Sequence, residues 1–193
     1  MKIEENLQLL NKNILITTTK SEEKMLIKDL YYNIQNQIDE VHVFCNSDLN
    51  HHYQGMTNAF YGIDFNNFDL IKYCEENRDI KKLIIIDNIL LKKNDNLTFL
   101  FLNGKCYDIT LIISNEFVQS FDPEIRNNLD YFFTAKHSTH QEIQNLFCSY
   151  YIFFTTMEEF KEKMECLQPY EFLITGSKPI INKYQIRNHK QIF

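Results

Sequence analysis

The stretch KLIIID at residues 82–87 carries four consecutive apolar residues and ends in Asp87. An unbroken run of branched apolar residues is typical of a strand at the centre of a parallel sheet that is covered on both faces. Open parallel sheets bind their ligands at the carboxyl ends of the strands. The stretch therefore predicts a buried central strand, with Asp87 at the edge where a ligand would bind.

Strand-like and helix-like stretches alternate on both sides of this segment, which is typical of βαβ construction. Further strands are predicted at 13–18, 41–45, 109–114, 131–135 and 170–175, and helices at 21–37, 65–78, 141–150 and 157–167, with another helix closing at 98–104. The polar stretch 46–54 is expected to form a loop or a short helix. The pattern predicts a three-layer α/β fold with a mostly parallel central sheet.

The domain organisation follows from length and from the scarcity of glycine and proline. The chain has 193 residues, which fits one medium domain. It contains only 4 Gly and 3 Pro, so no flexible linker is expected. We therefore expect a single domain over 1–193, with residues 1–12 as an N-terminal extension and 182–193 as a C-terminal tail that adds an edge to the sheet.

Composition and charge exclude several classes of protein. Hydrophobic residues make up 44% of the chain, but its apolar runs fall far short of the roughly 18 residues that a membrane span needs. The acidic, Asn-rich start is unlike a signal or transit peptide, so an intracellular protein is expected. The 20 Lys and Arg against 26 Asp and Glu give a net charge of −6, which argues against a protein that grips DNA through its whole surface.

The cysteines and histidines predict no metal site. The 5 cysteines are widely spaced and form no CxxC pair, so they indicate neither a disulfide framework nor a zinc module. His137 and His140 form a lone HxxH, with Cys148 further along the chain. Because zinc sites usually need a second ligand pair at defined spacing, we interpret these residues as ordinary core or surface positions.

The first strand-to-helix turn lies where a P-loop NTPase carries GxxxxGK[ST]. Residues 17–25 read TTTKSEEKM, without any glycine, and Glu22 and Glu23 would repel phosphates. Lys24 occupies the place of the phosphate-binding lysine, but Met25 follows it where the Mg²⁺-binding hydroxyl should be. The phosphate loop is therefore degenerate.

Two interpretations of this turn remain. Lys20 or Ser21 would contact an anion at the start of the helix if a residual phosphate site survives. The favoured interpretation is an ordinary helix with Ser21 as N-cap and Lys24 in solvent.

Asp87 lies at a Walker-B-like position, where a carboxylate meets Mg²⁺ through water. In an active NTPase this aspartate is commonly followed by a second acid that orients the attacking water. The next residue in this chain is Asn88, whose amide cannot take a proton.

The order of these segments resembles the poxvirus and giant-virus genome-packaging ATPases, P-loop NTPases of the FtsK–HerA superfamily. The resemblance runs from about residue 13 to the C-terminal region. It rests on five blocks in the same order, which are ILITTTKSEEKMLIKDL (14–30), KLIIIDNILL (82–91), FLNGKCYDITLIISNEF (101–117), DPEIRNNLDYFF (122–133) and MEEFKEKMECLQPYEFLITGS (157–177). The resemblance implies a P-loop NTPase-like domain of the RecA/FtsK type.

The resemblance also assigns family positions to individual residues. Asp87 matches the Walker-B aspartate, Asn88 departs from its acidic neighbour, and Glu116 stands where the family usually has a sensor glutamine. Arg126 matches an arginine that could act as a finger on a neighbouring subunit's γ-phosphate. The residues that match around it are Asn128, Asp130 and Tyr131.

An ordinary structural role for Arg126 competes with the finger. It would then be a helix-terminus or salt-bridge residue that holds the loop of Asp130. The sequence does not decide between the two roles.

These departures favour a pseudo-ATPase, a catalytically inactive binding or structural subunit in virus assembly. No cofactor is then expected, and the partners are a ring neighbour, an active paralogue or a capsid protein, in the host cytoplasm, a viral factory or the virion. The alternative is an active but divergent ATPase that drives DNA into the capsid. It would need ATP and Mg²⁺, held by Lys20 or Lys24 and Asp87, with Arg126 supplied by a partner.

Overall fold

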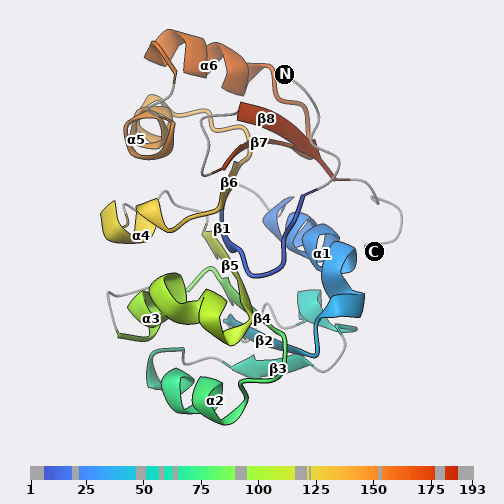
Figure 1. Cartoon of the computed structure of the whole chain (residues 1–193). Coiled ribbons are helices and arrows are strands. Elements are labelled where there is room, and N and C mark those ends of the chain that lie inside the picture. The colour runs from blue at the N-terminus through green and yellow to red at the C-terminus, as the bar shows by residue number, and fades with distance from the viewer. Residues whose placement is uncertain are drawn as a thin grey trace.

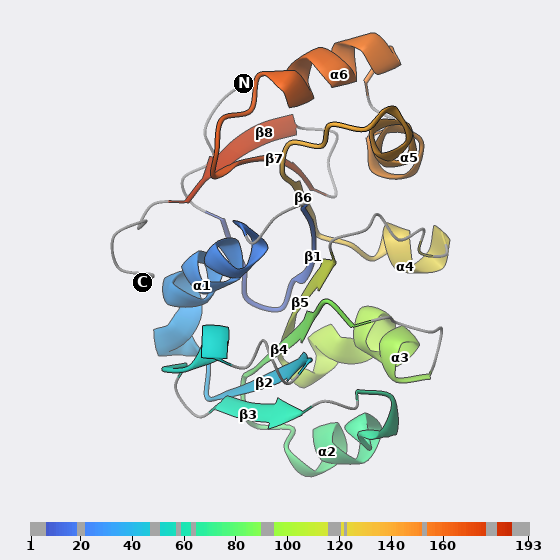
Figure 2. The same cartoon turned by 180° about the vertical axis from the view of Figure 1, so that it is seen from behind.

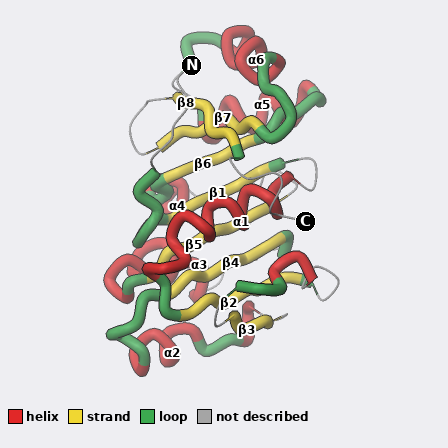
Figure 3. Tube along the Cα trace, turned by 90° about the vertical axis from the view of Figure 1, so that its right-hand side faces the viewer, coloured by secondary structure: helices red, strands yellow, loops and turns green. Residues whose placement is uncertain are grey.

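The computed structural model of the chain describes residues 7–18, 22–46, 51–56, 59–62, 65–89, 95–115, 121, 123–151, 154–176 and 181–186. Within these residues, eight strands form one sheet in the order β3-β2-β4-β5-β1-β6-β7-β8. The strands are β1 (Asn13–Thr17), β2 (Glu40–Cys45), β3 (Ala59–Gly62), β4 (Lys82–Asp87), β5 (Ile109–Asn115), β6 (Tyr131–Thr134), β7 (Glu171–Gly176) and β8 (Ile181–Gln185). Figure 3 shows them side by side along the length of the molecule.

Most of the sheet is parallel. Neighbouring strands from β3 through β6 pair in parallel, and β7 and β8 extend the sheet as an antiparallel pair. The register places Asp87 beside Ser114 and Thr17 beside Asn115, so the ends of β4, β5 and β1 meet at one edge. The predicted mostly parallel sheet is confirmed.

Helices cover both faces of this sheet, as Figures 1 and 2 show. Among the described helices, α1 (Glu22–Ile34) packs on one face. The other face carries α2 (Leu70–Glu76), α3 (Asp95–Asn103), α4 (Pro123–Asn127), α5 (His140–Tyr150) and α6 (Met157–Glu165). The three-layer α/β fold predicted from the alternation of strands and helices is confirmed.

Strand alternation in β4 orients the residue that matters most for function. Leu83 and Ile85 pack in the core on the α1 side, whereas Ile84 and Ile86 pack in the core on the opposite side. Since side chains alternate along a strand, Asp87 points to the same side as Leu83 and Ile85. Its carboxylate therefore faces the beginning of α1.

Several boundaries differ from the sequence prediction. The predicted helix 65–78 is a 3-10 turn (Phe65–Asn67) followed by α2, which begins after Asp69, whose side chain accepts from the Lys72 N–H. The short elements β3 and α4 were not predicted, because four or five residues are too few to show a helical or strand period. The tail contributes β8 at the edge of the sheet, antiparallel to β7, and residues 187–193 lie outside the described residues.

Candidate functional site

Asp87 ends β4, and three groups meet its carboxylate. The Tyr53 hydroxyl donates to Oδ2 at 2.6 Å, and the Ser114 hydroxyl donates to Oδ1. The Lys24 Nζ lies 3.4 Å from Oδ2. The side chain of Asp87 is fully buried, and both of its oxygens contact protein groups.

Lys24 is buried, and the prediction that it lies in solvent is wrong. Its residue is 7% exposed, and its Nζ donates to Glu23 Oε1 at 2.7 Å in addition to the contact with Asp87. The physical reason is the placement of α1 across the face onto which Asp87 points. An inward lysine in the first turn of that helix reaches the carboxylate.

Glu23 is a member of this buried cluster. The Thr18 hydroxyl donates to its Oε2 at 2.8 Å, while its Oε1 accepts from Lys24. Burial raises the pKa of Glu23, although Lys24 and Thr18 oppose that shift. Burial disfavours the charge on Lys24, but Asp87 and Glu23 outweigh it and hold the pKa of the ammonium above its ordinary value. The Lys24 ammonium therefore stays protonated and contacts two buried carboxyl groups.

Tyr53 was not singled out by the sequence, which predicted only a loop or short helix over 46–54. It lies in a 3-10 turn at 51–53 and is fully buried. Burial and the adjacent Asp87 raise its pKa well above the ordinary value, so the hydroxyl keeps its proton and acts as a donor. The available signal was an aromatic residue inside an otherwise polar stretch.

Asn88 turns the chain away from the sheet. Its φ is +52°, in the left-handed region, and its backbone N–H donates to the Ser114 carbonyl at 3.0 Å. Asparagine tolerates this conformation better than most residues with a side chain. The position next to Asp87 therefore carries an amide that suits the local backbone.

Three predicted site residues cannot be placed. Lys20, Ser21 and Glu116 lie outside the described residues. Their roles as phosphate contacts and sensor stay predictions.

Arg126 lies in the last turn of α4, on the face of the sheet opposite α1. Its Nη1 donates to the Ser149 carbonyl near the end of α5, at 3.1 Å. The salt bridge to Asp130 that the structural interpretation allowed is not formed, although Arg126 does lie at the end of a helix. The structure does not bring Arg126 to Asp87, because the two lie on opposite faces of the sheet.

Asp130 has other partners. Its carboxylate lies 3.3 Å from Lys12 Nζ and 2.7 Å from Lys105 Nζ, and it also accepts from the Asn13 backbone N–H at 2.8 Å. These contacts tie the turn before β6 to the amino end of β1. Lys12 and Lys105 are therefore the counter-ions of Asp130, the role that the structural interpretation assigned to Arg126.

Mg·ATP would require the described residues around Asp87 and Lys24 to rearrange. A metal-bound water would have to reach an Asp87 carboxylate that is closed to solvent and already meets Tyr53, Ser114 and Lys24. A phosphate would have to compete with Glu23 and Asp87 for Lys24. Met25 offers no hydroxyl to a metal, and no glycine precedes Gly55 in the chain. Glycine is the residue that lets a backbone wrap closely around phosphate.

Comparison with solved structures places this geometry in a known fold. The genome-packaging NTPase B204 of Sulfolobus turreted icosahedral virus 2, in complex with ATPγS, aligns with a TM-score of 0.70 and 15% identity over 92% of this chain and 99% of that chain. The DNA-packaging ATPase B204 of Sulfolobus turreted icosahedral virus aligns with a TM-score of 0.68 and 14% identity over 92% and 98%. This chain has the fold of the viral genome-packaging NTPases.

A second kind of ATPase shares the same fold. The EssC protein (ATPases 2 and 3) from Geobacillus thermodenitrificans aligns with a TM-score of 0.60 and 15% identity over 94% of this chain and 41% of that chain. The P-loop NTPase-like fold implied by the resemblance is thereby confirmed. No protein-family model and no curated protein matches the sequence.

The described residues contain neither a membrane-spanning helix nor a cluster of metal-binding side chains. None of the helices in those parts of the chain combines the length and apolar character needed to cross a bilayer. Across the same residues, no three His, Cys, Asp or Glu side chains are grouped so that they could hold a metal ion.

Proposed function

We propose that this chain is a homologue of the viral genome-packaging ATPases that does not hydrolyse ATP and acts as a binding or structural subunit in virus assembly. The observation that carries the proposal is the burial of the Asp87 carboxylate among Tyr53, Ser114 and Lys24. The two side chains that would hold Mg²⁺ and phosphate are paired with each other and closed off from solvent.

The chemistry of phosphoryl transfer supports this proposal. Catalysis in P-loop NTPases consists almost entirely of positioning and electrostatic stabilisation of the phosphates, the metal and the attacking water. The sequence lacks the glycines of the phosphate loop, has Met25 in place of the metal-binding hydroxyl and has Asn88 in place of the second acid. Each loss removes a separate part of that machinery.

The contact between Lys24 and Asp87 also favours a second candidate, the active but divergent ATPase. These are the two residues that such an enzyme would retain, and they meet at the carboxyl edge of the sheet. ATP would then have to separate them, with its phosphates replacing Asp87 as the partner of Lys24.

Calorimetric titration with Mg·ATP separates the two candidates. The inactive homologue gives no binding heat at millimolar Mg·ATP and releases no phosphate above the level of a Lys24→Met control. Phosphate release above that control, together with a micromolar dissociation constant for Mg·ATP, would overturn the proposal and establish the active alternative.

The proposed role also predicts how the chain meets its partners. The net charge of −6 disfavours nonspecific contact with DNA, so we propose that the chain acts through protein contacts. Titration of fluorescent duplex DNA at 50 and 200 mM salt tests this, and no binding is expected at either concentration. Tight binding of DNA with a steep salt dependence would contradict this and favour a translocase-like role.

The proposal that Arg126 is donated to an active paralogue has its own test. Arg126→Ala should lower the ATPase rate of such a co-purified partner while leaving this chain folded. An unchanged partner rate with a lowered melting temperature would show that Arg126 stabilises this chain through its contact with Ser149 and is not donated to the partner.

A further inference from the structure

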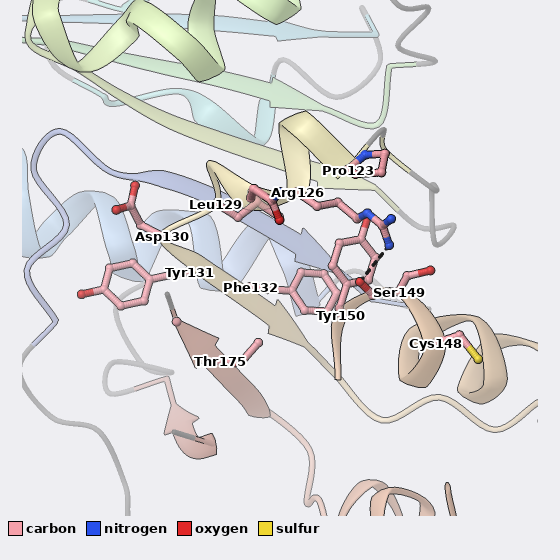
Figure 4. Close-up of a pocket in the computed structure, with 12 residues that line it drawn as sticks. Pro123, Arg126, Leu129, Asp130, Tyr131, Phe132, Cys148, Ser149, Tyr150 and Thr175 are labelled. Carbon is pink, nitrogen blue, oxygen red and sulfur yellow. Dashed lines mark hydrogen bonds between the residues drawn. The ribbon is translucent and has the colours of Figure 1, made fainter. Parts of the chain in front are cut away.

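A cavity of about 400 Å³ lies between α4, α5 and the strands β6 and β7 (Figure 4). The rings of Phe132 and Tyr150 stack in its wall, with centroids 4.2 Å apart and planes inclined by 22°. Arg126 lies on one side of these rings and Thr175 on the other. The cavity therefore combines apolar walls with polar groups at separate points, which is the usual character of a small-ligand site.

Arg126 brings a charge to this cavity without a counter-ion. Its Nη1 is used by the Ser149 carbonyl, but its Nε is closed to solvent and has no hydrogen-bond acceptor. Among the described residues, no carboxylate lies within ion-pair distance of the guanidinium. A buried donor or charge that lacks a partner is unfavourable, so this group is ready to accept an anion.

Asp130 also lines the cavity, but Lys12 and Lys105 engage its carboxylate, so it does not neutralise Arg126. Figure 4 shows Asp130 and the Arg126 guanidinium at opposite ends of the cavity. Among the described residues that line the cavity, Arg126 is the one cation. A single guanidinium matches a singly charged ligand better than a phosphate dianion.

We propose that this cavity binds a monocarboxylate carried on an apolar body, with its carboxylate paired to Arg126 and its apolar part against Phe132 and Tyr150. The Nε–Nη2 edge of a guanidinium matches a carboxylate with two parallel hydrogen bonds, and this is the edge that Ser149 leaves unused. For this pairing the guanidinium has to turn about its outer torsions, because its Nε is closed to solvent. Thr175 Oγ, buried and without a partner, offers a second contact to a ligand that passes the rings.

The site is independent of the nucleotide edge. Its lining residues come from α4, α5, β6 and β7, whereas Asp87 and Lys24 lie on the α1 side of the sheet. The proposal therefore does not rest on the absence of ATP hydrolysis, and either can fail without the other.

Side-chain NMR of the ¹⁵N-labelled full chain tests the proposed carboxylate site directly. The chain has three arginines, Arg78, Arg126 and Arg187, so the Nε–Hε region is simple, and Arg126→Lys assigns the Arg126 signal. Benzoate and N-acetylphenylalanine are the carboxylate probes, benzamide is the uncharged probe, and inorganic phosphate is the competing anion. We expect the carboxylates to move the Arg126 signal saturably, while Arg78, which is exposed and packs over the Tyr107 ring, serves as the internal control.

Variants of the lining residues show whether the carboxylates bind in this cavity. Binding to Arg126→Lys, followed through the Gly176 amide, should weaken about tenfold or more, because lysine lacks the two-pronged edge. Cys148→Phe should block binding, since this exposed residue lines the cavity. Cys166→Phe is the matched control, because Cys166 is also exposed and does not line it.

The outcomes decide the proposal and the source of the ligand. Tighter binding of N-acetylphenylalanine than of benzoate indicates the end of a polypeptide, and the reverse indicates a free small acid; both support the proposal. It is overturned if no probe moves Arg126, if benzamide binds as well as benzoate, or if phosphate binds and the carboxylates do not.

Discussion

The Lys24 ammonium lies 3.4 Å from Asp87 Oδ2 and joins the first turn of α1 to the end of β4. Both residues are more than nine-tenths buried, and Tyr53 and Glu23 close the cluster around them. Removal of one member of a buried ion pair is strongly unfavourable, because the charge left behind has neither water nor a partner. The contact is therefore a stability feature as well as the central feature of the candidate site.

Lys24→Met should lower the free energy of unfolding by about 3 kcal/mol, since it leaves two buried carboxyl groups without their shared cation. Urea titration followed by circular dichroism measures the change. Lys161→Met is the control, because Lys161 and Glu165 are exposed and 3.8 Å apart, and such a pair contributes at most about 1 kcal/mol. Equal effects of the two variants would contradict the buried pairing.

Tyr53→Phe should lower the free energy of unfolding by about 2 kcal/mol, the contribution of a hydrogen bond to a charged group. The ring stays in place, so the loss reports the hydroxyl that donates to Asp87. The same urea titration measures it. A variant as stable as the native chain would mean that Asp87 does not depend on this donor.

Sequence patterns predicted most of the fold and little of this cluster. Apolar runs such as 82–87 identify buried strands because a short unbroken run of branched apolar residues fits a strand that is covered on both faces. The inward direction of Lys24 could not be predicted, since residues 17–25 read as a polar helix start. Its partner Asp87, and the Tyr53 that donates to Asp87, come from distant segments. Arg126 illustrates a further reason, because its partner is the backbone carbonyl of Ser149, which any residue at that position would supply.

Asn88→Glu, which restores the acid of an active NTPase, should not restore ATP hydrolysis. It should also lower stability by about 1 kcal/mol, because φ at this position is +52° and a longer side chain is disfavoured there. Asn88→Gly is the matched control and should be as stable as the native chain or more so. Phosphate release and urea titration give the two readouts, and measurable turnover by Asn88→Glu would count against the inactive homologue.

Stability should fall as the pH drops below about 6.5, the range in which unfolded histidine takes up a proton. Burial lowers the pKa of His137, although Glu142 Oε2 lies 3.7 Å from its Nδ1 and opposes the shift. The unfolded chain then binds more protons than the folded chain between the two pKa values, so acid favours unfolding.

His137→Gln should therefore make the dependence of stability on pH shallower between pH 7 and pH 5. His140→Gln is the control, since His140 is exposed three residues later, and it should retain the native slope. Urea midpoints at several pH values measure both slopes. A slope unchanged in His137→Gln would assign the acid sensitivity to other groups.

The antiparallel attachment of β7 has a consequence for how such a chain can evolve. Gly176 pairs with Tyr131 at the beginning of β6, whereas Asp87 and Ser114 pair where β4 and β5 finish. The two ends of the strands are separated by the apolar interior of the sheet, and selection can act on each without the other. A retained binding role would be visible as slow change around Tyr131 and Gly176, whatever happens at the Asp87 end.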